Sequence, residues 1–299
     1  MNVQPNDPSR VVRSLDIALP RGFGERLPID SLAFHIERMV RPYRLQLKPM
    51  SGGMRVVGEE TAVWLAEKIL EEVATRLGAT TRLDQRQIDV IAMAAIQKAL
   101  KYDLAFRLAG IPHPLRPMTV SQLAFLNAML HEERDLIFGI GPTGTGKTHL
   151  AIAAGLSLLA EERVRKIVIT RPYVLFEGEV VTAPLRAEIR NEGQLTPIED
   201  ELNLLIGHEQ TTRLFQEGKL EITPLGWLRG RTFNESFIIV DEAQNLTSRH
   251  MRMAVTRIGQ GSRMVITGDP EQIDLHGDEL SGLPELLQLV SGTDLAMVH

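Results

Sequence analysis

The sequence predicts an α/β protein with a mostly parallel sheet flanked by helices, preceded by a small α/β module. Three observations lead to this prediction. Strand-like and helix-like segments alternate from residue 118 onward, which is typical of a parallel sheet covered by helices. A glycine-rich stretch, residues 141–148, lies between an apolar run and a helical pattern. The apolar run 237–240 ends in two acidic residues, as expected where a strand reaches the functional edge of such a sheet.

Composition limits the classes of protein to consider. With 299 residues, 43% of them hydrophobic, the chain is able to form one large core or one large and one small core. It has no cysteine, which excludes disulfides and zinc–thiolate sites. The start of the chain lacks the apolar core of a signal peptide, and no apolar run reaches about 18 residues. We therefore expect a cytoplasmic protein with no membrane partner.

Charge is unevenly distributed along the chain. The net charge of −5 is too small to indicate a partner. Residues 1–116 carry 17 Lys/Arg against 13 Asp/Glu, whereas residues 117–299 carry 16 against 25. A basic front end is compatible with a module that touches RNA, and ordinary surface variation explains it equally well.

The first part of the chain divides into a tail, a small module and a linker. Residues 1–26 are expected to be a flexible tail, with an added strand as the alternative. Residues 27–110 predict a small α/β module with a connecting helix, which is a candidate for nucleic-acid binding. Three prolines in residues 111–117 predict an extended linker. The expected elements are helices at 30–40, 59–77 and 84–109 and strands at 44–48 and 54–58.

Residues 118–299 form the predicted main domain. The expected strands are 135–140, 166–170, 219–223, 236–240, 263–267 and 295–298. The expected helices are 120–130, 149–160, 197–206 and 210–217.

The glycine-rich stretch matches the phosphate-loop pattern G-x-x-x-x-G-K-[ST] in its required context of strand, loop and helix. Glycines let backbone N–H groups approach phosphate oxygens, and the following helix adds the positive end of its dipole. We expect Lys147 to reach the β- and γ-phosphates and Thr148 to bind Mg²⁺. The predicted nucleotide-binding residues are Gly141, Pro142, Thr143, Gly144, Thr145, Gly146, Lys147 and Thr148.

The two acids after the apolar run 237–240 have separate expected roles. Asp241 is predicted to hold Mg²⁺ together with Thr148, because a carboxylate at a strand end lies beside the phosphate loop in this architecture. Glu242 is predicted to orient and deprotonate the attacking water. This second acid favours hydrolysis of the triphosphate over transfer to a substrate hydroxyl, the reaction of a P-loop kinase.

Two glutamines extend the predicted site. Gln272 follows the strand 263–267 in a Gly-Asp-x-x-Gln turn and is expected to sense the γ-phosphate, although a turn built from Gly, Asp and Pro is the simpler interpretation. Gln122 lies on a helix before the loop, where its amide is able to pair with N6 and N7 of adenine. The sequence therefore favours ATP as the nucleotide.

Four arginines are candidates for an arginine finger or for contact with nucleic acid. Three of them lie where loops are expected to gather at the edge of the sheet, and Arg257 lies on the helix after Asp241; each is equally well explained by a structural ion pair. They are Arg171, Arg229, Arg231 and Arg257.

Together these motifs resemble the PhoH family of P-loop ATPases, which have a RecA-like domain related to superfamily 1 helicases. The resemblance rests on GPTGTGKT at 141–148, ITRP at 169–172, and the run from Arg229 to Leu275. It implies an ATPase often assembled in rings, linked to RNA metabolism and, in bacteria, to a ribosomal-RNA-processing endonuclease. Members of that family carry a further arginine beyond the position of His299. If that arginine serves hydrolysis, we expect either slow turnover or dependence on Arg257, Arg231 or another subunit.

Two functions follow from this resemblance. The first is an RNA-acting ATPase that forms a homo-oligomer, such as a hexameric ring, since one ATPase domain alone provides half of a strand clamp. The second is an ATP-switched adaptor that docks a partner such as a nuclease. Dependence of the ATPase rate on RNA distinguishes the two.

Overall fold

The computed structural model describes residues 12–19, 29–40, 43–79, 83–103, 106–131, 135–172, 196–275, 280–291 and 296–298. Backbone contacts divide the chain into a small unit, residues 1–106 and 115–124, and a large unit, residues 107–114 and 125–299. The division runs through helix α5 (Val120–His131) and through the proline-rich stretch 111–117, which has residues in both units.

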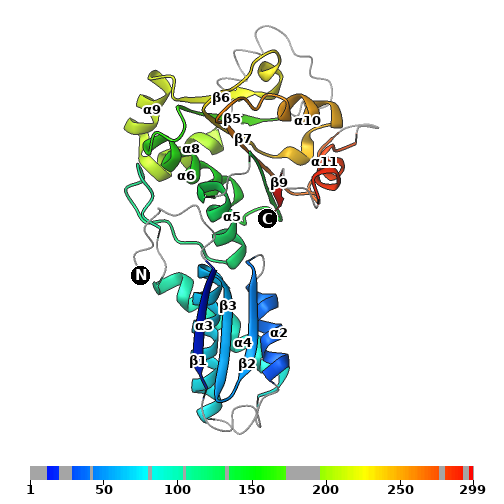
Figure 1. The fold of residues 1–299 in the computed structure, drawn as a ribbon. Coiled ribbons are helices and arrows are strands. Elements are labelled where there is room, and N and C mark those ends of the chain that lie inside the picture. Colours follow the sequence, from blue (N-terminus) through cyan, green and yellow to red (C-terminus); the bar gives the residue numbers. More distant parts are fainter. Residues whose placement is uncertain are drawn as a thin grey trace. The chain divides into compact units, whose positions relative to one another are not determined.

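The small unit is an antiparallel sheet with helices packed on one face (Figure 1). Its strands lie in the order β1-β3-β2. The amphipathic pattern of α3 (Glu60–Ala79) places Val63, Ala66 and Ile69 in the core shared with the sheet. The remaining elements are β1 (Val12–Ala18), α2 (Ile29–Met39), β2 (Leu45–Met50), β3 (Gly53–Glu59) and α4 (Gln85–Lys98), followed by the π-helical turn Ala99–Asp103.

The prediction of a flexible tail over residues 1–26 is wrong for residues 12–18, which form strand β1. Leu15 and Ile17 alternate with polar residues and pack against the core of the small unit. On the other face Arg55 donates two hydrogen bonds to Asp16, at 2.7 and 2.8 Å. The alternative, an added strand, is therefore correct for residues 12–18. This strand pairs with β3 of the same chain. Residues 1–11 and 20–26 lie outside the described residues.

The helix expected at 84–109 begins as predicted and ends early. Asp84 and Gln87 form a capping box, in which each side chain accepts a hydrogen bond from the backbone N–H of the other residue. The regular helix stops at Lys98. Phe106 then pairs with Leu115 through two backbone hydrogen bonds of 2.8 Å, which requires an extended chain.

The large unit contains a sheet in the order β6-β5-β7-β8-β4-β9, and all of its strand pairs are parallel. The mostly parallel sheet flanked by helices is thereby confirmed, with every expected strand found to within one residue at each end. Its strands are β4 (Leu136–Ile140), β5 (Lys166–Arg171), β6 (Leu220–Pro224), β7 (Ser236–Val240), β8 (Arg263–Gly268) and β9 (Ala296–Val298). Its helices are α6 (Lys147–Ala160), α8 (Thr196–Ile206), α9 (His208–Gln216), α10 (Ser248–Val255) and α11 (Leu283–Val290), with 3₁₀ turns η2 (Leu225–Leu228) and η3 (Ala243–Asn245).

Both faces of this sheet are covered (Figure 1). Helix α6 lies on one face and is buried from Leu150 to Leu158, which explains its uninterrupted run of small and aliphatic residues. Gly155 allows close approach, since a Cβ there would lie 2.8 Å from Cδ1 of Phe237. Helices α10 and α11 and the turn η2 share a core with the other face. This packing fixes the strand ends that carry the predicted site.

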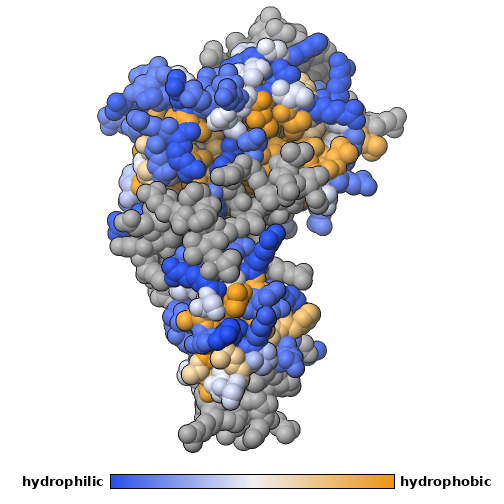
Figure 2. All heavy atoms as spheres, in the orientation of Figure 1, coloured by the Kyte–Doolittle hydropathy of each residue, from blue (hydrophilic) through white to orange (hydrophobic). Residues whose placement is uncertain are grey.

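In the coloured part of Figure 2, hydrophilic side chains predominate and hydrophobic ones form separate patches. Exposed large hydrophobic residues occur in both units, as is normal for a folded protein. Among the described residues, no helix combines the length and apolarity needed to cross a bilayer. The exposed residues include Phe34, Val90 and Met93 in the small unit and Trp227, Leu280 and Leu289 in the large unit.

Candidate nucleotide-binding site

The phosphate loop follows β4 and leads directly into α6. Gly144 and Gly146 have φ values of 78° and 81°, which L side chains rarely adopt, and Gly146 is the N-cap of α6. Nζ of Lys147 donates to the carbonyl oxygens of Gly141 and Pro142, at 2.6 and 2.8 Å. The lysine thus lies over the loop, at the helix N-terminus that attracts phosphate.

The loop is fastened to the end of β8, the neighbouring strand. Its first residue, Gly141, donates from its backbone N–H to the Gly268 carbonyl at 3.1 Å. The backbone N–H of Thr143 donates to Oδ2 of Asp269 at 2.9 Å. The Thr143 hydroxyl donates to Oε1 of Gln272 at 2.7 Å. Gln272 therefore lies at the loop, as a phosphate sensor requires, while its contact with a γ-phosphate stays a prediction.

Asp241 lies at the end of β7 and faces the start of α6. It is 2% exposed, and its Oδ1 accepts from the hydroxyls of Thr148 at 2.8 Å and Thr267 at 2.6 Å. Its Oδ2 is buried without a hydrogen bond among the described residues, although Nη2 of Arg171 lies 3.0 Å away as an ion pair. A hydroxyl and a carboxylate side by side are oxygen ligands of the kind that Mg²⁺ prefers. The pair Thr148–Asp241 thus fits the metal predicted for it.

Glu242 follows in a left-handed backbone conformation, with φ 54° and ψ 42°. Such a conformation is costly for a residue with a side chain and is concentrated at functional sites. Each carboxylate oxygen of Glu242 has a partner. Nη2 of Arg171 donates to Oε1 at 3.2 Å, and Nε2 of Gln244 donates to Oε2 at 2.7 Å.

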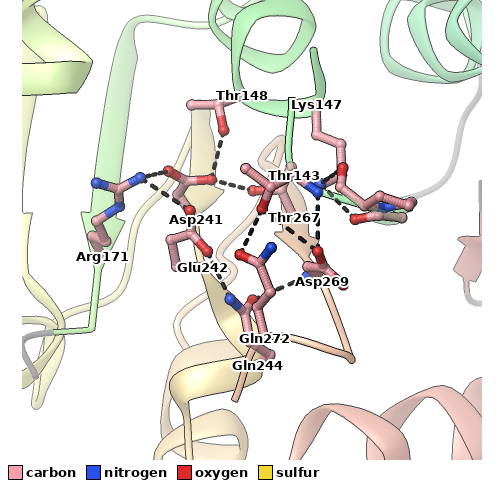
Figure 3. Close-up of polar contacts among 12 residues, drawn as sticks. Thr143, Lys147, Thr148, Arg171, Asp241, Glu242, Gln244, Thr267, Asp269 and Gln272 are labelled. Atoms are coloured by element: carbon pink, nitrogen blue, oxygen red, sulfur yellow. Dashed lines mark hydrogen bonds and ion pairs between the residues drawn. The ribbon is translucent and has the colours of Figure 1, made fainter. Parts of the chain in front are cut away.

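Gln244 and Asp269 complete a network that the sequence analysis did not identify (Figure 3). Gln244 is 1% exposed, and its Oε1 accepts from the backbone N–H of Asp269 at 3.0 Å. Asp269 is 4% exposed and holds the phosphate loop through Thr143. Hydrogen bonds therefore connect the loop to Glu242 by way of β8. Two features of the sequence pointed to these residues. Gln244 is a polar residue two positions after Glu242, and Asp269 is an acid directly after β8.

The four candidate arginines have different environments. Arg171 contacts both acids. Arg231 donates two hydrogen bonds to Glu221, at 2.6 and 2.9 Å, and this lowers the pKa of Glu221 to about 2, assisted by Lys166. Arg257 donates to the carbonyl of Arg231 at 2.9 Å and so holds the chain after η2. Arg229, by contrast, is exposed. Arg171 is the one of these four that the structure brings to Asp241 and Glu242.

Gln122 belongs to the small unit and caps helix α5. Its Oε1 accepts from the backbone N–H of Met118, and its own N–H donates to the hydroxyl of Thr119 at 3.1 Å. This capping explains a glutamine here without a nucleotide. Recognition of adenine by Gln122 stays a prediction.

No cluster of three His, Asp or Glu side chains suited to a metal occurs in the part of the chain that the structure describes. A metal at Thr148 and Asp241 would therefore depend on water and on phosphate oxygens for its other ligands, which is the usual arrangement for Mg²⁺.

Comparisons with known proteins identify the family of the chain. The family model described as PhoH-like protein matches residues 114–299. A PhoH-like protein of Bacillus subtilis is 33% identical over 80% of this chain and 76% of its own length. A PhoH-like protein of Mycobacterium tuberculosis is 31% identical over 87% of this chain and 74% of its own length. A Sulfolobus solfataricus SWI2/SNF2 ATPase core solved with dsDNA shares 18% identity over 55% of this chain and 34% of its own, with a TM-score of 0.37. The chain has a parallel sheet with a phosphate loop typical of nucleotide-binding proteins, and it belongs to the PhoH family.

Proposed function

We propose that this protein binds ATP with Mg²⁺, hydrolyses it, and acts on RNA as a ring-forming ATPase. The observation that carries the proposal is the position of Glu242. It adjoins Asp241 at the end of β7 and is connected by hydrogen bonds to the phosphate loop. A second acid at this place is able to take a proton from the attacking water. A protein that only binds nucleotide does not need such a base.

Each residue of the site has a separate role in the proposed hydrolysis. Lys147 would exchange its loop carbonyls for the β- and γ-phosphates, and backbone N–H groups of the loop would bind phosphate oxygens. Thr148 and Asp241 would hold Mg²⁺, which when bound neutralises charge on the phosphates. Glu242 would accept the proton of the attacking water. Gln272, bonded to Thr143, would lie near the γ-phosphate.

The RNA and assembly parts of the proposal have separate support. The net positive charge of residues 1–116 supports contact of the small unit with a polyanion. Assembly into a ring, such as a hexamer, would let a neighbouring subunit contribute to each site, with Arg229 as an exposed candidate. A ribosomal-RNA-processing endonuclease is a candidate partner by resemblance to the family.

Steady-state ATPase measurements test this proposal. We expect hydrolysis that requires Mg²⁺, increases with single-stranded RNA, and is abolished by Lys147→Ala. Native mass spectrometry of the same preparation measures the size of the assembly. A monomer without ATPase activity in the presence and absence of RNA would contradict the proposal.

An ATP-switched adaptor is the second candidate, and one observation favours it. Both carboxylate oxygens of Glu242 have partners, so the base is restrained in this structure. A slow hydrolase of this kind would hold ATP for long periods and dock a partner meanwhile. Tight ATP binding with slow turnover that RNA does not change would favour the adaptor.

A further inference from the structure

Arg171 neutralises both acids of the site with one nitrogen. Its Nη2 lies 3.0 Å from Oδ2 of Asp241 and 3.2 Å from Oε1 of Glu242 (Figure 3). Arg171 ends strand β5, which pairs with β7 beside the acids. A guanidinium in this place provides the positive charge that two adjacent carboxylates require.

This contact weakens Glu242 as a base, because it holds one carboxylate oxygen and places a positive charge beside it. A carboxylate that takes a proton from water needs a free oxygen close to that water. Oε2 is bound to Gln244, which is fully buried and fixed at its other end by the backbone of Asp269. Oε1 is bound to Arg171. Since the Gln244 link is fixed at both ends, Arg171 is the partner that has to leave.

The environment of Arg171 leaves its hydrogen bonding incomplete. Its side chain is 23% exposed, so one side faces solvent. Its Nε is buried and has no hydrogen bond among the described residues. Arginine usually satisfies such a donor, because an unsatisfied buried donor is unfavourable. The ion pair with the acids therefore leaves the hydrogen bonding of the guanidinium incomplete, while the exposed part of the side chain is open to another acceptor.

The adjoining loop identifies the chemistry of that acceptor. Arg171 pairs in register with Pro224 at the end of β6, and the turn η2 follows. Leu225 and Leu228 are buried and anchor this turn, which leaves Trp227 47% exposed. Arg229 is exposed directly after it. An exposed aromatic side chain on an anchored turn, with Arg229 next to that turn and Arg171 in register with the strand before it, suits single-stranded nucleic acid, whose bases stack while its phosphates pair with cations.

We propose that Arg171 is a positioning residue that restrains Glu242 until single-stranded nucleic acid binds beside it. Trp227 stacks on a base, Arg229 pairs with the backbone, and a neighbouring phosphate draws Arg171 away from Glu242. Oε1 is then free for the attacking water. This proposal rests on the proposed hydrolysis and names both the strand-binding residues and the route by which the strand increases the rate.

The kinetic test compares wild type with Arg171→Met, Arg171→Lys and the control Arg213→Met. Arg213 is also paired with a glutamate, Glu217, on helix α9 away from the acids. Arg171→Met should raise the rate without nucleic acid about five- to tenfold and abolish stimulation. Arg171→Lys should keep low basal activity and part of the stimulation, because its charge remains. Arg213→Met should behave as wild type.

Strand binding without nucleotide gives a readout independent of hydrolysis. Fluorescence anisotropy with labelled oligo(U) and oligo(dT) of equal length, at fixed salt, measures affinity. Glu242→Gln removes one of the two negative charges that hold Arg171, while Asp241 remains, and should tighten binding about threefold or more, by linkage. Arg171→Met and Trp227→Ala should weaken it about five- to tenfold or more. Binding of both oligonucleotides indicates recognition of the backbone, and binding of oligo(U) alone indicates RNA.

Particular results would overturn the inference. A lower basal rate in Arg171→Met with stimulation retained would show that Arg171 assists catalysis. Unchanged strand affinity in Glu242→Gln would show that the acid and the strand do not compete. If wild type lacks ATPase activity under all conditions, the proposed hydrolysis fails, and the binding measurements still decide whether Arg171 is shared between Glu242 and the strand.

Discussion

Gln244 should determine the turnover rate, because it fixes Glu242 from the buried side. Gln244→Leu conserves volume but removes both hydrogen bonds, to Oε2 of Glu242 and from the N–H of Asp269. We expect kcat to fall about 10- to 100-fold, since general-base catalysis depends on the orientation of the base. KM for ATP should change less, because Lys147 and its loop contacts remain.

The same variant has a calculable effect on stability. The Asp269 N–H, in a residue 4% exposed, would lose its acceptor, at a cost of about 1–3 kcal/mol. Glu242 has a side chain that is 35% exposed, so water replaces much of its lost bond. For a domain of this size the melting temperature should fall by about 3–8 °C. The control Gln210→Leu, on the exposed side of α9, should change neither kcat nor melting temperature.

A second substitution separates the two hydrogen bonds. Gln244→Glu keeps an oxygen acceptor for Asp269 but places a carboxylate against Oε2 of Glu242. The new carboxyl should have a raised pKa beside a like charge, and its protonated form restores a donor. Activity should therefore recover as the pH falls. Steady-state kinetics from pH 5.5 to 8.5 check this, and a Gln244→Leu enzyme with wild-type kcat would refute the role given to Gln244.

Three further predictions concern the loop, an ion pair and the core. Lys147→Ala should weaken ATP binding at least about tenfold in calorimetry while leaving thermal stability near wild type, because the lysine bonds only its own loop among the described residues. Glu221→Gln should lower the free energy of unfolding at pH 7 by about 1–2 kcal/mol, less than the full pKa shift implies because water screens the pair. Since the pKa of Glu221 is lowered to about 2 by Arg231, its stabilisation is present above about pH 4.5 and is lost as pH falls toward 2, so urea unfolding curves of the two proteins should converge in acid. Gly155→Ala should destabilise by about 1–3 kcal/mol despite better helix propensity, because its Cβ would lie 2.8 Å from Phe237, and an unchanged melting temperature would contradict this packing.

The large unit was predictable because its signals are local. Each strand is a short apolar run, and β7 followed by Asp241 and Glu242 is typical of a strand reaching its functional edge. The glycine loop carries its own context of strand and helix. Local patterns of this kind require no knowledge of which strands are neighbours.

Gln244 and Asp269 were not predictable in the same way. Their contacts join residues far apart in sequence, with Asp269 lying 126 residues from Thr143. Those contacts depend on β8 lying between β4 and β7, an order that no periodicity encodes. Strand β1 was uncertain for a related reason. Its partner β3 begins 35 residues after β1 ends, and only that pairing distinguishes a strand from a tail.

The order of the sheet also explains why nucleotide and base are coupled. Because β8 lies between the loop strand and the acid strand, its end reaches both sides at once. Asp269 accepts from the loop through Thr143 and donates to Gln244, which holds Glu242. A phosphate that moves Thr143 must therefore act on Asp269, and through it on the buried side of Glu242. Arg171 acts on the other oxygen from β5. Glu242 is thus held through the loop network on one side and by Arg171 on the other, so under our proposal its release depends on the partners of both.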